Sequence, residues 1–213
     1  MKRKTVIGLG LLGTFLLWTV AVCVVDVQAT GPQGTAVGLA AVNGFFHRLT
    51  GVHMALYTIT DWLGLVPLAV VLGFGCLGLV QWVKRKRLRK VDRSILVLGG
   101  FYLAVLAAYG IFETVVINYR PVLINGNLES SYPSSTTMLA MCVMPTAMMQ
   151  LQSRIQNRTL RRWALLLMGT FTAFMVIGRL LSGVHWLTDV IGGALLSAGL
   201  VMLYAAINKN SSL

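Results

Sequence analysis

The sequence predicts an all-α, polytopic membrane protein with six transmembrane helices, folded as a single integral membrane domain over residues 1–213. Of these residues, 56% are hydrophobic and only 11% are charged, and the mean hydropathy is +0.76. Ordinary soluble domains do not reach such values. The apolar residues also gather in runs long enough to cross the ~30 Å hydrocarbon core of a bilayer. Composition and patterning therefore exclude an ordinary soluble protein.

Six apolar runs are separated by polar or basic segments. The first run follows the basic residues 2–4, and residues 27–29 resemble a signal-peptide cleavage site. Because this run is longer than a usual signal core, we interpret it as a retained span. Residues 26–61 form a mixed outer loop, in which residues 37–49 fit an amphipathic helix at the membrane interface. The predicted spans are residues 5–25, 63–83, 94–117, 135–151, 163–181 and 185–206.

The positive charge falls mostly on one side of this layout. The net charge of +12 would suggest nucleic acid as a partner of a soluble protein. Here, however, fifteen of the eighteen lysines and arginines fall at the amino end, in the loops after spans two and four, or at Lys209. The positive-inside rule makes that face cytoplasmic, with both termini on it. The basic runs therefore predict contact with anionic membrane lipids and no nucleic-acid partner.

Three cysteines, Cys23, Cys76 and Cys142, lie inside apolar runs. They have no metal-ligand spacing, so we expect neither a disulfide framework nor a metal site. Nothing in the sequence indicates a cofactor, and it does not define the oligomeric state.

The turn between the last two predicted spans carries Arg179, His185 and Asp189. Ionisable residues are costly in lipid, so their presence there indicates a function. From His185 onward the pattern is helical, so His185 and Asp189 project from one face and the carboxylate can orient the imidazole. Gly183 allows the turn that returns Arg179 to them, and an arginine fork facing a histidine suggests a bound phosphate. A simple capped interfacial turn is the alternative interpretation.

Two further segments reach the same outer face. One contains Arg120, followed by Pro121. The other opens the fourth span, where Ser134 and Ser135 follow Pro133 in the manner of a helix start. A helix start offers free amide groups and the positive end of the helix dipole, so it can bind an anion. With the histidine, these groups predict a phosphoryl-transfer site at headgroup level, suited to a lipid phosphate.

The order and spacing of these residues resemble the type-2 phosphatidic acid phosphatase family, which shares a superfamily with the vanadium haloperoxidases. The family pattern is Lys-x6-Arg-Pro, then Pro-Ser-Gly-His, then Ser-Arg-x5-His-x3-Asp. The matching positions are Arg120-Pro121, Pro133-Ser134, and Arg179, His185 and Asp189. The resemblance extends to the six-span layout and implies a phosphatase-type helical bundle core.

This resemblance implies a two-step hydrolysis of a lipid phosphate at the outer membrane face, without metal or cofactor. His185 would attack phosphorus to form a phosphohistidine, and Asp189 would hold the ring. Arg120 and Arg179 would stabilise the equatorial oxygens, aided by the amides near residues 134–135.

Four motif positions depart from the family pattern. Glu113 replaces lysine, Ser135 replaces glycine, Thr136 replaces histidine and Gly178 replaces serine. The absent histidine is the family's general acid, and losing a proton donor typically costs ~10²- to 10⁴-fold in rate. A phosphate leaving from a diphosphate needs that proton less than an alkoxide does. We therefore hypothesise that the protein favours a lipid diphosphate, such as an isoprenyl diphosphate, over a phosphomonoester.

Glu113 has two possible roles. It could supply the missing acid or base, or it could pair with Arg120 or Arg179 in a structural role. The second is favoured because a carboxylate among phosphate-binding arginines would compete with the substrate. The altered residues Glu113 and Thr136 also leave an alternative function open, that of a homologue that binds or senses lipid phosphates without hydrolysing them.

Overall fold

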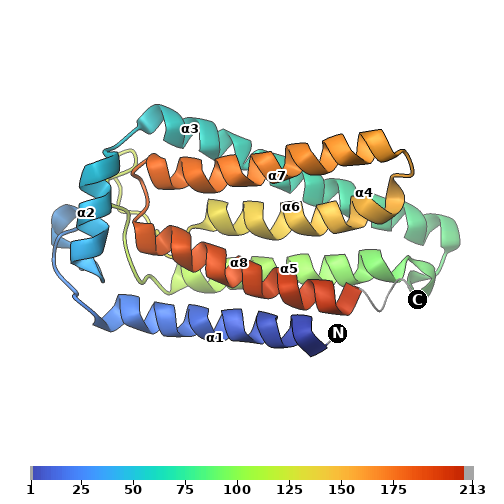
Figure 1. The fold of residues 1–213 in the computed structure, drawn as a ribbon, viewed down its shortest axis with the longest axis horizontal. Coiled ribbons are helices and arrows are strands. Elements are labelled where there is room, and N and C mark those ends of the chain that lie inside the picture. The colour runs from blue at the N-terminus through green and yellow to red at the C-terminus, as the bar shows by residue number, and fades with distance from the viewer. Residues whose placement is uncertain (1, 209–213) are drawn as a thin grey trace.

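The computed structural model describes residues 2–208, so Lys209 lies outside the described residues. Over this range the regular secondary structure is helical. The helices are α1 (Lys2–Val24), α2 (Ala40–Thr50), α3 (Met54–Leu63), α4 (Leu65–Arg85), α5 (Arg93–Thr114), α6 (Ser135–Arg154), α7 (Arg158–Leu181) and α8 (Leu187–Asn208), with short 3-10 turns η1 (Pro32–Gly34) and η2 (Leu88–Lys90). The long helices run side by side as one bundle, and α2 lies across one end of it (Figure 1).

Within residues 2–208, five helical segments are long and apolar enough to cross a membrane, namely α1, α3 together with α4, α5, α7 and α8. Helix α6 is the sixth long helix and packs against both α7 and α8. It is less apolar because its polar side chains are buried among neighbouring helices, where they find partners. Gln150, for example, donates to the Tyr204 hydroxyl at 2.6 Å. The predicted all-α membrane bundle is therefore confirmed.

Helix α3 occupies residues that the sequence assigned to the outer loop. Residues 26–61 are mixed in character, but the hydroxyls of α3 bond within the helix, since Thr58 donates to the Met54 carbonyl at 3.0 Å and Thr60 to the Leu56 carbonyl at 2.9 Å. Gly64 separates α3 from α4, and the two helices form one candidate span of 32 residues. The predicted boundary at residue 61 was therefore about two helical turns too late.

Helices α1 and α8 approach each other closely through two glycines. A Cβ on Gly8 would lie 3.1 Å from the Gly199 carbonyl oxygen, and a Cβ on Gly199 would lie 2.8 Å from Leu12. Trp18 of α1 also donates to the Thr188 carbonyl at 3.2 Å. Helix α1 thus packs against α8 as part of the bundle.

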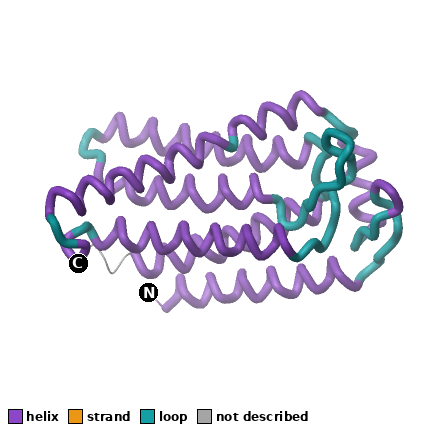
Figure 2. The backbone as a smooth tube through the Cα atoms, turned by 180° about the vertical axis from the view of Figure 1, so that it is seen from behind, coloured by secondary structure: helices purple, strands orange, loops and turns teal. Residues whose placement is uncertain are grey.

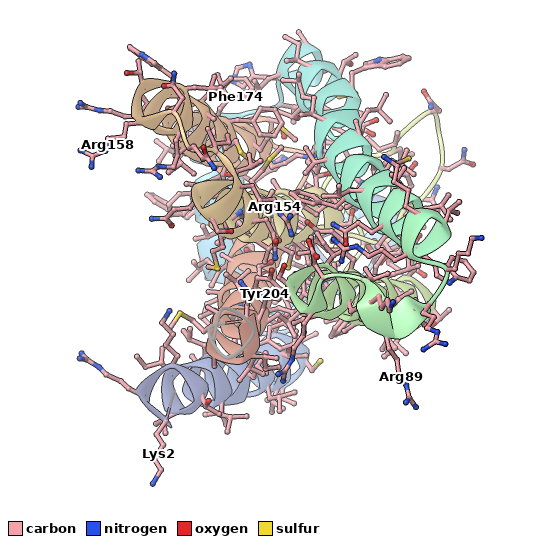
Figure 3. All side chains as sticks on the ribbon, turned by 90° about the vertical axis from the view of Figure 1, so that its right-hand side faces the viewer. Lys2, Arg89, Arg154, Arg158, Phe174 and Tyr204 are labelled. Atoms are coloured by element: carbon pink, nitrogen blue, oxygen red, sulfur yellow. The ribbon has the colours of Figure 1, made fainter. Side chains whose placement is uncertain are left out.

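The bundle has two chemically different ends. The start of α1 and the end of α8 lie at one of them, together with the α4–α5 and α6–α7 connections (Figure 1). The basic end comprises residues 2–4, 84–93 and 154–162, and the loop end comprises α2 and residues 115–134 and 182–186. At the basic end, Lys2, Arg89 and Arg158 extend outward (Figure 3). Most of the irregular chain gathers at the loop end (Figure 2).

The glycine contact between α1 and α8 generates a stability prediction. Replacing Gly8 by Leu should lower the free energy of unfolding in detergent by ~1–3 kcal/mol, because the side chain would be forced against the α8 backbone. Gly10→Leu is the matched control, since a Cβ there meets nothing within 4 Å. Thermal unfolding of both variants checks this. Equal stability of the two would contradict close packing of α1 on α8.

Candidate active site

The α7–α8 turn sets the position of His185. Helix α7 ends at Leu181, and the Ser182 hydroxyl donates to the Arg179 carbonyl at 2.8 Å. Gly183 follows with φ +67°, and a Cβ there would lie 1.9 Å from the Gly51 carbonyl oxygen. This turn therefore requires glycine. Helix α8 begins only at Leu187, so His185 lies in the turn and not, as predicted, within the helix.

The two ring nitrogens of His185 face different partners. Nε2 lies 3.3 Å from Nη1 of Arg120, and Nδ1 lies 3.6 Å from Oδ2 of Asp189. Since a guanidinium can only donate, Nε2 must accept and the ring proton belongs on Nδ1, facing the carboxylate. At 3.6 Å the second contact is longer than a hydrogen bond. Burial lowers the pKa of His185 and keeps the ring neutral, with its lone pair on Nε2.

Asp189 is fully buried in the first turn of α8 and bonds to three segments. Its Oδ2 accepts from the Trp186 amide at 2.9 Å, and its Oδ1 accepts from Nδ2 of Asn118 at 3.4 Å. Its carbonyl accepts from the Ser134 amide at 3.0 Å. The residue thus joins the α5–α6 loop, the start of α6 and the α7–α8 turn.

Arg120 lies in the α5–α6 loop, where its amide donates to the Glu129 carbonyl at 3.0 Å. Its Nε lies 3.0 Å from Oε2 of Glu129 but does not point at it, so the contact is an ion pair and not a hydrogen bond. The guanidinium is largely buried and also lies over the Tyr57 ring, 5.7 Å from its centroid. Arg120 is therefore held between His185 and its own counter-ion.

Arg179 has a side chain that is only 1% exposed. Its Nη2 donates to Oδ1 of Asp61 at 2.8 Å and to Oγ1 of Thr136 at 2.6 Å. Its Nη1 lies 3.4 Å from both the Tyr57 carbonyl and the Thr60 hydroxyl. The guanidinium carbon lies 4.9 Å from the centroid of the Tyr57 ring, which thus contacts both arginines.

Helix α6 begins as its sequence predicts. Ser134 is its N-cap, and its hydroxyl accepts from the Thr137 amide at 3.5 Å. Ser135 and Thr136 occupy the first turn, where amide groups have no partner within the helix. Through Thr136 this turn contacts Arg179, so the helix start and the arginine face one space.

A family model described as the PAP2 superfamily matches residues 113–212. Over this segment, called the PAP2 region below, the chain is similar to the PAP2 superfamily. The PAP2 region contains all three motif segments gathered at the loop end. It confirms the family resemblance that the motif spacing indicated.

The chain is also similar to a solved PAP2 structure, the crystal structure of the first transmembrane PAP2 type phosphatidylglycerolphosphate phosphatase from Bacillus subtilis. The alignment covers 95% of this chain and 96% of that one, with a TM-score of 0.56 and 21% sequence identity. At that identity the likeness establishes a shared fold. None of the curated proteins compared matches the chain.

The sequence suggested Glu113 as the counter-ion of Arg120 or Arg179, but the structure gives these two arginines other counter-ions. Among residues 2–208, the ion pairs of Arg120 and Arg179 are with Glu129 and Asp61, and Glu113 forms neither of them. Glu113 instead lies near the end of α5, where its carboxylate faces Tyr109. A usable signal existed, because Asp61 and Glu129 are acidic residues of the outer half of the chain and a buried arginine needs a counter-ion.

An apolar groove of about 1030 Å³ runs along the bundle between α4 and α5, with α6 contributing to its wall. Its polar lining includes Asp61, Ser135 and Thr136, so one part of it borders the arginine site. Towards the basic end it reaches Trp82 and Val91. Several lining leucines are exposed on the bundle surface, namely Leu65, Leu79, Leu103 and Leu106. The groove is therefore open sideways, towards the lipid that would surround these spans.

The glycine in the α7–α8 turn generates a second prediction. Gly183→Ala should lower the free energy of unfolding by ~2–5 kcal/mol, because left-handed strain adds to a clash with the Gly51 carbonyl. The control is Gly126→Ala in the α5–α6 loop, where φ is +80° but a Cβ meets nothing within 4 Å. Thermal unfolding should rank Gly183→Ala clearly below the control. The reverse order would mean that the turn is not held against residue 51.

Proposed function

We propose that this protein is a membrane-embedded phosphatase that hydrolyses a lipid phosphate or diphosphate through a phosphohistidine intermediate. One observation carries the proposal, namely a buried, neutral imidazole whose Nε2 lies 3.3 Å from Arg120 and whose Nδ1 faces Asp189. A nucleophilic histidine requires this tautomer. The position beside an apolar groove supports a lipid as the substrate.

In the first step, Nε2 of His185 attacks phosphorus and the bond to the leaving oxygen breaks. The ring, now bonded at both nitrogens, carries positive charge, which the Asp189 carboxylate stabilises from the Nδ1 side. Arg120 and Arg179 bind the equatorial oxygens, where negative charge accumulates in the transition state. Amides in the first turn of α6 add further donors.

In the second step, water attacks the phosphohistidine and releases inorganic phosphate, which restores the neutral ring. Before the substrate arrives, the two site arginines are neutralised by Asp61 and Glu129. An entering phosphate group must therefore displace these carboxylates. Both carboxylates are partly exposed, 56% for Asp61 and 41% for Glu129, so each can turn towards solvent.

The hydrocarbon chain of the substrate would lie in the groove between α4 and α5. Helix α4 has 21 residues and is thus about 32 Å long at 1.5 Å per residue, enough for a long acyl or isoprenyl chain. The Bacillus subtilis protein is named for phosphatidylglycerolphosphate, a phosphomonoester lipid. A lipid monoester and a lipid diphosphate both carry anionic oxygens that the two arginines would bind.

The site would face the extracytoplasmic side, with both termini in the cytoplasm. The lysines and arginines cluster at the basic end, and the site residues lie at the loop end of the bundle. The positive-inside rule assigns the basic end to the cytoplasm, where it would contact anionic lipids.

The intermediate provides the direct test. Incubation with a lipid substrate that carries labelled phosphate, followed by a rapid quench at alkaline pH, should trap label on the purified protein. His185→Ala should abolish that label. His53→Ala is the matched control at the same end of the bundle, where the ring of His53 contacts the Thr50 carbonyl, and it should keep the label. Saturable lipid-phosphate binding without label or turnover would instead indicate the non-hydrolytic homologue.

The groove generates a further prediction. Gly75 lines it, Gly73 does not, and a Cβ at either position meets nothing within 4 Å. Gly75→Leu should therefore raise KM for a long-chain substrate by ~10-fold, which corresponds to about 1.4 kcal/mol, while a short-chain soluble analogue is unaffected. Gly73→Leu should alter neither value. Equal KM values for the long-chain substrate in both variants would show that the chain lies elsewhere.

A further inference from the structure

Asp61 lies beside the second motif, which lacks the proton-donating histidine of the family pattern. Its Oδ1 and the Thr136 hydroxyl contact the same atom, Nη2 of Arg179, at 2.8 Å and 2.6 Å. The two oxygens are therefore neighbours. Thr136 occupies the position at which the family pattern has histidine. A carboxylate from α3 thus borders the place of the missing proton donor.

The two arginines of the site contact different groups. Arg120 contacts the attacking nitrogen of His185, whereas Arg179 contacts Thr136 and Asp61. In-line displacement puts the leaving oxygen on the side of phosphorus away from the nucleophile. The Arg179 side is therefore the side of the leaving group.

The groove supports the same assignment independently. Asp61, Ser135 and Thr136 are part of its lining. In a lipid phosphate the leaving oxygen joins phosphorus to the part of the molecule that carries the chain. With the chain in the groove and phosphorus beside His185, that oxygen lies next to these three residues.

We propose that Asp61 is the general acid of this protein, in place of the histidine that the family pattern has at the position of Thr136. The Asp61 side chain is 56% exposed, so it can exchange protons with solvent, whereas the arginine it contacts is almost fully buried. Glu113 does not fill the role, because its carboxylate faces Tyr109 and it does not line the groove. This inference rests on the proposed hydrolysis.

The proton balance of the reaction is complete with Asp61 alone. When a phosphate monoanion binds Arg179, it displaces the Asp61 carboxylate from this arginine. The carboxylate then faces the negative charge of the phosphate and accepts the proton that the phosphate carries. As the N–P bond to His185 forms and the P–O bond breaks, Asp61 gives that proton to the leaving oxygen, and the alcohol departs. The water that attacks the phosphohistidine leaves both of its protons on the phosphate, which is released as the monoanion. The Asp61 carboxylate, already deprotonated, then pairs with Arg179 again.

The test compares two leaving groups in the full-length protein. One substrate is phosphatidic acid in detergent micelles, which loses an alkoxide, and the other is p-nitrophenyl phosphate, which loses a stable phenolate. Asp61→Asn should lower kcat for phosphatidic acid by ~10²- to 10⁴-fold, because the proton donor is gone. For p-nitrophenyl phosphate the loss should stay below ~10-fold, because a phenolate leaves without a proton.

Glu129→Gln is the matched control, since Glu129 is also a carboxylate paired with a site arginine but lies on the side of the nucleophile. Its effect should be the same on both substrates. An equal loss on both substrates for Asp61→Asn would mean that Asp61 only holds Arg179, and would overturn the inference. So would an unchanged rate with phosphatidic acid.

Failure of the proposed function would look different. A wild-type protein that hydrolyses neither substrate and traps no label on His185 would remove the hydrolysis, and the role of Asp61 with it. A wild-type protein that forms phosphohistidine but shows no leaving-group effect in Asp61→Asn would keep the hydrolysis and reject Asp61 alone.

Discussion

The rest of the site depends on the hydrogen bonds of one buried carboxylate, that of Asp189. Removing a carboxylate from water is costly unless it gains hydrogen bonds and a nearby positive group. Here the Trp186 amide and the Asn118 side chain donate to it, and His185 lies beside it. Because the Asp189 carbonyl also accepts from Ser134, one residue fixes the helix start, the loop and the histidine relative to each other.

Each of the two site arginines is balanced by a carboxylate from another segment of the chain. Breaking a buried ion pair costs about 3–5 kcal/mol, so Arg179 could not remain unpaired in the bundle. Its partner Asp61 is more than half exposed, so only the arginine of this ion pair is buried. In the proposed reaction a phosphate takes the place of the carboxylate, because the exposed Asp61 side chain can turn towards solvent. The arginine then remains compensated at every stage.

Much of this arrangement could be predicted from the sequence. Long apolar runs and the asymmetry of basic residues indicated the bundle and its two ends. The motif spacing indicated that Arg120, Arg179, His185 and Asp189 would meet, and the structure brings them together. Helix starts were predictable too, since Ser134 has a side chain that caps a helix and does so.

The parts that could not be predicted depend on contacts between distant segments. Asp61 lies 118 positions before Arg179 in the chain, and no local pattern announces their ion pair. The same holds for Tyr57, whose ring contacts both arginines. Glu113 was misjudged because motif alignment fixes its place in the chain but not the direction of its side chain. Helix α3 was missed because its polar residues satisfy their hydrogen bonds internally, which composition alone does not reveal.

The sideways opening of the groove determines how a substrate would reach the site. A lipid whose chain enters between α4 and α5 never leaves the leaflet, so its encounter with the protein is a two-dimensional diffusion process. The quantity that governs occupancy is then the mole fraction of the lipid among its neighbours and not its bulk concentration. Diluting the substrate with inert lipid at a fixed total amount would slow turnover, and the leaflet itself becomes the reservoir that sets the rate.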